Sequence, residues 1–282
     1  MTHTTEPAVF CIGETKLNKD ELQNYLQFIG AGDWTSDAPD DVSEIIEIDG
    51  RGCYMSFGTE LNENITKVRE SNKDYLENII KVNHGAVLEH SFVNFQIVDV
   101  SRVFTHELVR HRVGVAISQE SLRFVRVDDI GYWIPKCFTG LDDDLQAVIV
   151  DTFDTHFAWS ETRYKGLLGV AGIKEFRLTT PGKLFPRGDA LEYFNNLPFG
   201  LKKKYTSAAR RLLPMGMATK IGWSCNIRAL RHVLEMRTHP SAEEEIRFVF
   251  EKIGFMAQKR WPNLFNDYHV NKTDGYMQFL RK

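Results

Sequence analysis

The pattern of hydrophobic and polar residues along this chain predicts strands in two places. Residues 43–48 (SEIIEI) form a short, β-branched apolar run followed by an Asp-Gly turn, so we expect a strand there. Residues 91–99 (SFVNFQIVD) alternate apolar and polar side chains, which is the pattern of a strand with one buried face.

Helical spacing is more frequent than alternation. Apolar residues at intervals of three and four predict helices over residues 62–82, 102–112, 142–165, 201–218, 226–238 and 241–260. Ser101 is a candidate N-cap for the second of these helices, and Ser241 with Glu244 matches a capping box at the start of the last. Residues 168–200 are dotted with Gly and Pro and have weak periodicity, so we expect a long surface excursion around residues 160–205.

These elements predict an α+β fold, a mixed helix and sheet domain in which helices are in the majority. The chain has 282 residues, of which 43% are hydrophobic, and this is enough to bury a substantial core. The sequence contains no internal repeat, low-complexity tract or flexible linker. Residues 1–282 are therefore expected to form a single domain.

Charge and cysteine content restrict the partners and the compartment. A net charge of −3 with 26% charged residues argues against a protein that coats nucleic acid. No apolar run approaches the roughly 20 residues that span a bilayer, and the N-terminus lacks a secretory signal pattern. The four cysteines lie far apart without a CxxC pair, which favours reduced thiols. We expect a cytoplasmic protein that binds neither nucleic acid nor membrane.

The stretch RHRVGVAISQESLRF, residues 110–124, places three cationic-type side chains directly before an apolar run. On one continuous helix Arg110 and Arg112 would lie about 200° apart. Either the helix ends there, or the two arginines serve different partners, such as two sites at a subunit interface. A solvated cationic face is the simplest alternative. The small and polar residues that follow favour instead a site for a phosphate and a planar heterocycle.

The stretch NIRALRHVLEMRTH, residues 226–239, places a cation on an apolar helical face. Arg237 shares that face with Leu230 and Leu234, and a buried guanidinium needs an anion or a strong acceptor. The acceptor is either a ligand or a structural carboxylate from elsewhere in the chain. Arg228 and His232 lie on the opposite face, which would meet solvent or another subunit.

The stretch HGAVLEHSF, residues 84–92, places His84, Glu89 and His90 at an element boundary, where functional residues often lie. No metal site is predicted, because the spacing is not HExxH and no fourth ligand is apparent. The sequence also lacks a GxGxxG after a strand, a P-loop and a GxSxG motif. A nucleotide would therefore be held by arginines and helix ends. The lysine run at residues 202–204 is expected to be a solvated helix start.

The three stretches together resemble the flavin-dependent thymidylate synthases. The family pattern of Arg-His-Arg followed by Ser-x-Arg-aromatic corresponds here to RHR at residues 110–112 and SLRF at residues 121–124. HGAVLEH matches the family's His-x-x-x-Leu-Glu-His block, and NIRALRHVLEMRTHPSAEEEIR matches its long C-terminal helix region. The three blocks occur in the family's order, and the resemblance covers residues 40–130 and 205–265.

The resemblance implies a homotetramer whose active sites are shared between subunits. It implies FAD as the cofactor, NADPH as the electron source, and transfer of a one-carbon unit from methylenetetrahydrofolate to C5 of dUMP. Uracil C5 becomes nucleophilic only if negative charge can build on the ring carbonyls. A desolvated guanidinium at Arg237 could stabilise that charge as an oxyanion hole does.

By position in the family's motifs, the resemblance assigns catalytic roles to Arg237, Ser121 and His84. Residues expected to bind the flavin are Glu89, Arg110, His111, Arg112, Ser118, Gln119, Glu120, Asn226, Arg228 and His232. Residues expected to hold the nucleotide are Glu107, Ser121, Arg123, Arg210 and Arg237, with Arg123 and Arg210 near its phosphate.

Three departures from the family pattern leave the choice of nucleotide open. Eight residues separate Arg112 from Ser121 where seven is common, Ala86 stands where Ser or Thr is frequent, and the segment 160–205 is longer than usual. Some relatives methylate UMP, so C5 methylation of UMP in nucleoside-antibiotic biosynthesis is the alternative function. A third possibility is a relative that binds a nucleotide without catalysis. The presence of Ser121 and Arg237 argues against it.

Overall fold

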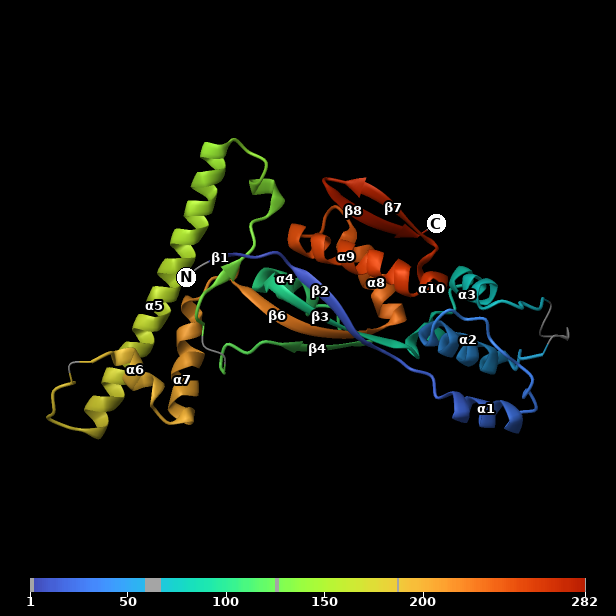
Figure 1. The fold of residues 1–282 in the computed structure, drawn as a ribbon, viewed down its shortest axis with the longest axis horizontal. Helices are drawn as coiled ribbons and strands as arrows, with labels where there is room; N and C mark the ends of the chain where they lie inside the picture. The colour runs from blue at the N-terminus through green and yellow to red at the C-terminus, as the bar shows by residue number, and fades with distance from the viewer. Residues whose placement is uncertain (1–2, 59–66, 125–126, 187, 282) are drawn as a thin grey trace. The chain divides into compact units, whose positions relative to one another are not determined.

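The computed structural model describes residues 3–58, 67–124, 127–186 and 188–281, and the chain divides into two compact units (Figure 1). The first unit comprises Met1–Ala8, Val98–His106 and Gln119–Ile221. The second unit comprises Val9–Ile97, Glu107–Ser118 and Gly222–Lys282. The α+β class with helices in the majority is confirmed. The single-domain assignment stays a prediction.

Helices make up most of the first unit: α5 (Asp143–Thr179), α6 (Ala190–Asn195) and α7 (Phe199–Ala209). The unit also holds the short 3-10 turns η2 (Lys136–Phe138) and η3 (Arg210–Leu212), and the parallel pair β1 (His3–Thr4) and β5 (Gly131–Tyr132). One face of α5 buries Phe157, Tyr164 and Leu168 in the core of this unit. Gly172 lets α6 approach α5 closely, since a Cβ there would lie 2.6 Å from the carbonyl oxygen of Ala190.

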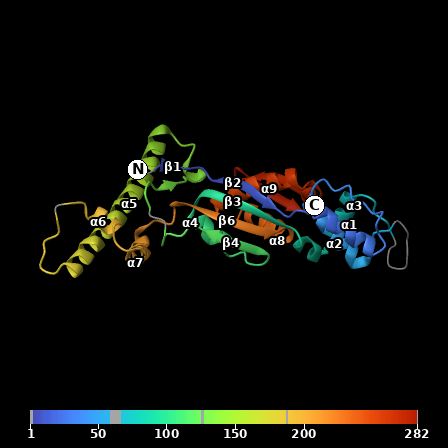
Figure 2. The ribbon, with the colours of Figure 1, turned by 60° about the horizontal axis from the view of Figure 1, so that its bottom comes forward.

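The second unit combines two groups of helices with a C-terminal hairpin. Its elements are α1 (Lys19–Phe28), α2 (Asp41–Tyr54), α3 (Asn72–Lys81), η1 (Gly85–Glu89), α8 (Ile227–Thr238), α9 (Glu244–Arg260), α10 (Pro262–Phe265), β7 (Tyr268–Thr273) and β8 (Tyr276–Arg281). Helices α1, α2 and α3 lie together in both views (Figures 1 and 2). Leu230 and Leu234 of α8, Phe250 of α9 and Phe279 of β8 are all fully buried in its core.

A four-stranded sheet has the strand order β2-β3-β6-β4, with β2 (Ala8–Glu14), β3 (Phe92–Ser101), β4 (Val115–Gln119) and β6 (Ala218–Asn226). The strand predicted at residues 91–99 is confirmed as β3, in which Val93, Phe95 and Ile97 are buried. Helix α4 (Arg102–Leu108) follows β3 directly. Ser101 caps it as predicted, because its Oγ accepts a hydrogen bond from the backbone N–H of Phe104 at 3.1 Å.

The strand predicted at residues 43–48 is wrong, because these residues lie inside α2. The Asp40 carboxylate accepts a hydrogen bond from the backbone N–H of Ser43 at 2.7 Å and starts the helix. Val42 and Ile46, one turn apart, are completely buried. A short apolar run does not distinguish a strand from a buried helix by periodicity, and here the cap decides.

Several predicted helices are present with different bounds. Helix α3 begins at Asn72, and residues 62–66 of the predicted helix lie outside the described residues. Helix α5 continues to Thr179 and α6 follows it, so much of the segment 168–200 is helical rather than irregular. Helix α7 ends at Ala209 and a 3-10 turn covers Arg210–Leu212, so the helix predicted to reach residue 218 ends earlier.

The capping box predicted at Ser241 and Glu244 is wrong. Helix α9 begins at Glu244, and the Glu243 carboxylate caps it by accepting from the backbone N–H of Glu245 at 2.9 Å. The hydroxyl of Ser241 is instead 2.7 Å from Nδ1 of His239. The prediction of a helix over residues 226–238 is confirmed by α8.

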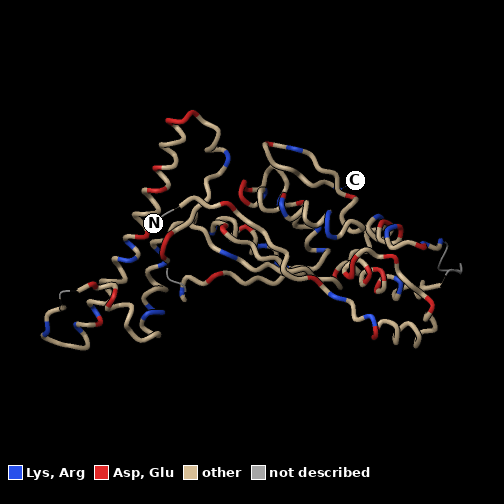
Figure 3. The backbone as a smooth tube through the Cα atoms, viewed as in Figure 1, with Lys and Arg blue, Asp and Glu red and all other residues tan. Residues whose placement is uncertain are grey.

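Charged residues of both signs are interspersed along the chain (Figure 3). None of the helices in the described part of the chain combines the length and the apolarity that a membrane crossing requires.

Candidate functional site

A cavity of about 510 Å³ opens beside the N-terminus of α8 in the second unit, and we call it the α8 cavity. Four of the predicted flavin-binding residues line it: Glu89, Asn226, Arg228 and His232. Apolar side chains of Leu88 and Val113 and the cation of Arg281 complete much of its wall. The structure therefore brings together residues from all three sequence blocks, since Val113 belongs to the stretch at residues 110–124.

Local structure around Asn226 explains how the α8 cavity forms. Asn226 is the N-cap of α8, because its side-chain oxygen accepts from the backbone N–H of Ala229 at 2.8 Å. Arg228 and His232 then fall one turn apart on the exposed face of α8, as the helical spacing predicted. Arg228 donates to the Glu89 carboxylate at 2.5 Å. Gly85 makes room for this arginine, since a Cβ there would lie 3.0 Å from its Nε.

The electrostatics of the α8 cavity favour an anionic ligand with an apolar part. The N-terminus of a helix carries a partial positive charge and unpaired N–H groups, and the Arg228 guanidinium adds to this positive charge. Leu88 and Val113 offer an apolar surface to a ring system. The volume lies within the range of small-molecule sites. These residues fit a phosphorylated cofactor that also carries a planar heterocycle.

The sequence left open whether the helix ends at the RHR stretch or the two arginines of this stretch serve different partners. The RHR stretch lies beyond the end of α4, so the helix does end there. Helix α4 ends at Leu108, so Arg110 and Arg112 do not share one regular helix. Both arginine side chains are exposed. Gly114 joins this stretch to α8: its carbonyl accepts from the backbone N–H of Asn226 at 2.9 Å. A Cβ on Gly114, whose φ is +68°, would lie 2.5 Å from the Asn226 side chain.

Arg237 is held by three contacts and is only 11% exposed. Its Nη1 donates to Oε2 of Glu107 at 2.7 Å, and its Nη2 donates to the backbone carbonyl of Glu107 at 3.0 Å. Its Nε donates to Nε2 of His111 at 2.7 Å. The acceptor that the apolar face required is thus a carboxylate from elsewhere in the chain, and Glu107 is itself a predicted site residue.

His111 connects the Arg237 cluster to the α8 cavity. Its ring lies edge-on to that of His232, with 6.3 Å between the ring centroids. Its Nε2 accepts from Arg237, so in this arrangement that nitrogen carries no proton. Burial and then the neighbouring Arg237 guanidinium lower the pKa of His111 from 6.5 to about 4.

We expect His111 to make the protein less stable as pH falls from about 6.5 to about 4. In this window the unfolded chain binds a proton at His111 that the native protein does not, so acidification favours unfolding. Urea unfolding between pH 7 and pH 4 tests this on the wild type and on His111→Gln. The stability advantage of the wild type over the variant should shrink as pH falls, and an advantage that does not depend on pH would contradict the expectation.

His84 lies at the start of η1 and stacks on Tyr54, with 5.9 Å between ring centroids and 17° between ring planes. The Tyr54 hydroxyl is 3.1 Å from Nδ1 of His84. Tyr54 is half exposed and was not among the predicted site residues. The spacing of the sequence offered no signal for it, since 30 residues separate the two rings. Among the described residues, no cluster of three or more His, Cys, Asp or Glu is arranged to hold a metal ion.

The remaining predicted nucleotide-binding residues belong to the first unit. Arg123 donates from Nε to the hydroxyl of Ser207 at 3.2 Å, which ties the Ser121–Phe124 turn to α7. Arg210 is exposed at the start of η3, directly after α7. Nearby in the sequence, Gln119 donates to Oγ1 of Thr105 at 2.9 Å. Glu120 joins β6 through its backbone N–H, which donates to the carbonyl of Lys220 at 3.0 Å. Ser118, on the exposed face of β4, belongs to the second unit.

Two residues of α7 that the sequence reasoning missed accompany the Arg123 turn. Lys203 is half-buried, and its Nζ lies 4.7 Å from the ring centroid of Phe124. The prediction that the lysine run at residues 202–204 is solvated is therefore wrong for this residue. Ser207 is the hydrogen-bond partner of Arg123. The four-residue interval between Lys203 and Ser207 is the signal that places both on one face of a helix.

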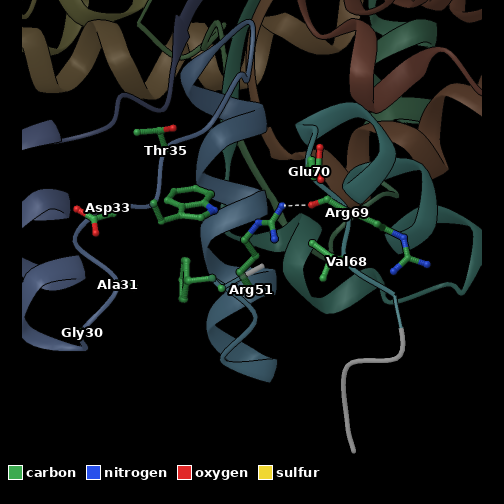
Figure 4. Close-up of a pocket in the computed structure, with 11 residues that line it drawn as sticks. Gly30, Ala31, Asp33, Thr35, Arg51, Val68, Arg69 and Glu70 are labelled. Atoms are coloured by element: carbon green, nitrogen blue, oxygen red, sulfur yellow. Dashed lines mark hydrogen bonds between the residues drawn. The ribbon is translucent and has the colours of Figure 1, made fainter. Parts of the chain in front are cut away.

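A second cavity, of about 420 Å³, lies between α2 and the segments around Trp34 and Arg69 (Figure 4). None of the predicted site residues lines it. Arg51, on its wall, is 4% exposed and pairs with the buried Glu47. Arg51 also donates to the backbone carbonyls of Ser56 and Arg69, at 2.9 and 2.8 Å. The charge on this wall is therefore neutralised within the protein and serves the fold.

The comparisons of this sequence with known proteins agree on one family. A family model described as "Thymidylate synthase complementing protein" matches residues 36–263. The flavin-dependent thymidylate synthase of Mycobacterium leprae (strain Br4923) is 35% identical over 247 residues, which cover 86% of each chain. That of Mycobacterium marinum (strain ATCC BAA-535 / M) is 34% identical over 271 residues, covering 94% of this chain and 95% of the relative.

Among solved structures, a UMP/dUMP methylase, PolB, from Streptomyces cacaoi bound with 5-Br dUMP has a similar fold. The TM-score is 0.58 at 16% identity, over 94% of this chain and 96% of that chain. The same protein bound with 5-Br UMP gives a TM-score of 0.57. At this level of identity the likeness concerns the fold.

Proposed function

Because this chain belongs to the flavin-dependent thymidylate synthase family, whose members are methyltransferases, we propose that it methylates dUMP at uracil C5. The one-carbon donor is methylenetetrahydrofolate, the reductant is NADPH, and the flavin is FAD. The observation that carries the proposal is the joining of the three sequence blocks in the second unit. There the Arg228–Glu89 pair and the Arg237–Glu107–His111 cluster meet through His111 and His232.

The α8 cavity is the proposed flavin site. Arg228 and the N-terminus of α8 suit the phosphates, and Leu88 and Val113 suit the rings. The other proposed flavin-binding residues are Arg110, His111, Arg112, Ser118, Gln119 and Glu120. Reduced flavin, when bound, supplies the hydride that completes the new methyl group.

Arg237 is the proposed catalytic residue for charge on the uracil ring. Its three contacts use three of the five N–H donors of a guanidinium, and among the described residues the other two have no protein acceptor. These two donors are free to meet a carbonyl oxygen of uracil as negative charge develops there. Glu107 and His111 hold the guanidinium in place, which limits the reorganisation needed during the reaction.

The nucleotide phosphate is proposed to bind Arg123 and Arg210, with Ser121 beside them in a catalytic role. The hydrogen bond from Arg123 to Ser207 supports this assignment, because it orients the guanidinium against α7. Lys203 adds a further cation to the same turn. His84, with Tyr54 stacked on it, is the third proposed catalytic residue, close to flavin and folate.

We further propose a homotetramer with active sites shared between subunits. Exposed apolar side chains on α5 support a subunit contact there, among them Val148, Trp159 and Val170, each at least half exposed. They recur every 11 residues, which keeps them on one side of the helix. The four cysteines are thiols rather than disulfides, which fits the proposed cytoplasmic location.

The purified protein is expected to be yellow, with the absorption bands of bound flavin, because an arginine-lined cavity matched to FAD should retain it. Absorption spectroscopy before and after denaturation measures the bound cofactor. A colourless preparation that takes up no added FAD would remove both enzyme functions. It would leave the non-catalytic nucleotide-binding relative as the explanation.

The alternative substrate is UMP. The eight-residue interval between Arg112 and Ser121 leaves this substrate open, and UMP is a substrate named for the structural relative PolB. Parallel turnover assays with dUMP and UMP, in the presence of NADPH and methylenetetrahydrofolate, separate the two. We expect turnover with dUMP, and a clear preference for UMP would move the assignment to the ribonucleotide.

A further inference from the structure

The C-terminal hairpin of β7 and β8 lies beyond residues 36–263, which the family model matches, and it still contributes a residue to the α8 cavity. That residue is Arg281, the last residue of β8, paired in register with Tyr268 of β7. The hairpin is drawn in red beside α8 and α9 in Figure 1. None of the three sequence blocks pointed to it.

The hairpin is fixed against α8 and α9 by packing and by hydrogen bonds. Phe279 is fully buried, and a Cβ on Gly254 of α9 would come 2.4 Å from its ring. The backbone N–H of Phe279 donates to Oγ1 of Thr238 at 3.0 Å. The hydroxyl of Tyr268 lies 3.1 Å from the carbonyl oxygen of Arg231. The backbone of Arg281 therefore has a defined place relative to α8.

The side chain of Arg281 is held at the cavity by Glu235 of α8. Its Nε donates to the Glu235 carboxylate, which also accepts from the hydroxyl of Tyr268 at 2.7 Å. The Arg281 side chain is nevertheless 43% exposed, so part of its guanidinium stays open to the cavity. An oriented and accessible guanidinium of this kind suits a phosphate better than a free surface lysine does.

The three arginines of the cavity differ in their accessibility. Arg231 is 3% exposed and binds both carboxylate oxygens of Asp267, so its charge is used inside the protein. Arg228 is 57% exposed and pairs with Glu89. Arg228 and Arg281 are therefore the two arginines of the cavity that a ligand can reach. They line the cavity together with the N-terminus of α8, which stabilises anions.

We propose that Arg281 binds a phosphate of the flavin nucleotide in the α8 cavity. This inference rests on the proposed function, since it takes the cavity to be the flavin site. It adds to that function a binding residue from outside the segment that the family model matches. The hairpin then has a role in cofactor affinity besides its role in the fold.

The test is a titration of the full-length apoprotein with FAD and with riboflavin, which has no phosphate, followed by flavin fluorescence. Arg281→Gln should weaken FAD binding by about 10- to 100-fold, the scale of one charge-assisted hydrogen bond, and leave riboflavin binding unchanged. Arg281→Lys should recover part of the FAD affinity. Lys272→Gln removes an exposed cation of the same hairpin that does not line the cavity, and it should change neither affinity.

Thermal melting of each apoprotein shows whether the variants fold. An Arg281→Gln protein that binds FAD as tightly as the wild type overturns the inference and leaves the proposed function intact. An equal loss of FAD and riboflavin affinity also overturns it, since the effect would then be structural. A wild-type protein that takes up no FAD overturns the proposed function and this inference together.

Discussion

Replacing Arg237 with alanine is expected to lower turnover by about 100-fold or more, the scale for loss of one preorganised donor to a developing negative charge. Nucleotide affinity should fall as well, because part of the contact is already made before the reaction. Flavin content should remain near that of the wild type, since Arg237 does not line the α8 cavity. Single-turnover oxidation of the reduced flavin measures the chemical step.

The stability of the Arg237→Ala protein separates catalysis from structure. The partner Glu107 is 29% exposed and keeps Arg110 at 3.3 Å, so its carboxylate is not left as a buried, unpaired charge. We expect the free energy of unfolding to fall by only about 1–2 kcal/mol, between the values for exposed and buried pairs. Lys272→Ala, which removes an exposed cation of the C-terminal hairpin, is the control and should change neither property.

If the Arg237→Ala protein loses much of its thermal stability but keeps near-normal turnover per folded molecule, the proposed catalytic role of Arg237 is contradicted. Arg237→Lys adds a second measurement, because it keeps the charge and loses the planar fork. We expect it to regain stability but little activity.

Replacing Arg51 with methionine is expected to cost about 3–5 kcal/mol in the free energy of unfolding. Its partner Glu47 is 1% exposed, so the variant leaves a carboxylate buried without its cation. The backbone carbonyl of Arg69 loses its donor too (Figure 4), and so does that of Ser56. Equilibrium unfolding in urea, at constant pH, measures the loss.

Two further variants make the Arg51 result interpretable. Lys73→Met removes an exposed cation from the neighbouring α3 and should stay within about 0.5 kcal/mol of the wild type. The double variant Glu47→Gln, Arg51→Met removes both charges and should regain part of the lost stability. If the double variant is less stable than Arg51→Met by the full effect of Glu47→Gln alone, the buried pair is not the cause.

Local sequence was sufficient where a pattern and its cap agree. The alternation in residues 91–99 became β3, and the helix over residues 226–238 became α8 with Asn226 as its N-cap. It was insufficient at residues 43–48, because a short apolar run fits a buried strand and a buried helix equally well. There the choice depended on Asp40 and on the face that Val42 and Ile46 present to the core.

The candidate site divides in the same way. The amino-acid sequence alone was sufficient to identify the three blocks and the family that they resemble. Helical spacing also placed Arg237 on an apolar face, where its guanidinium required an acceptor. The identity of that acceptor could not be read from spacing, since Glu107 lies 130 residues away.

Arg281 and Tyr54 show what the sequence leaves undetermined about this protein. Neither belongs to a motif, and each reaches its partner only because the chain folds back over tens of residues, 46 between Arg281 and Glu235 and 30 between Tyr54 and His84. Where caps and periodicity agree, the sequence determines whether a local segment is helix or strand, because both act over a few residues. Which side chains share a cavity depends on the packing of distant segments, and only the tertiary structure decides it.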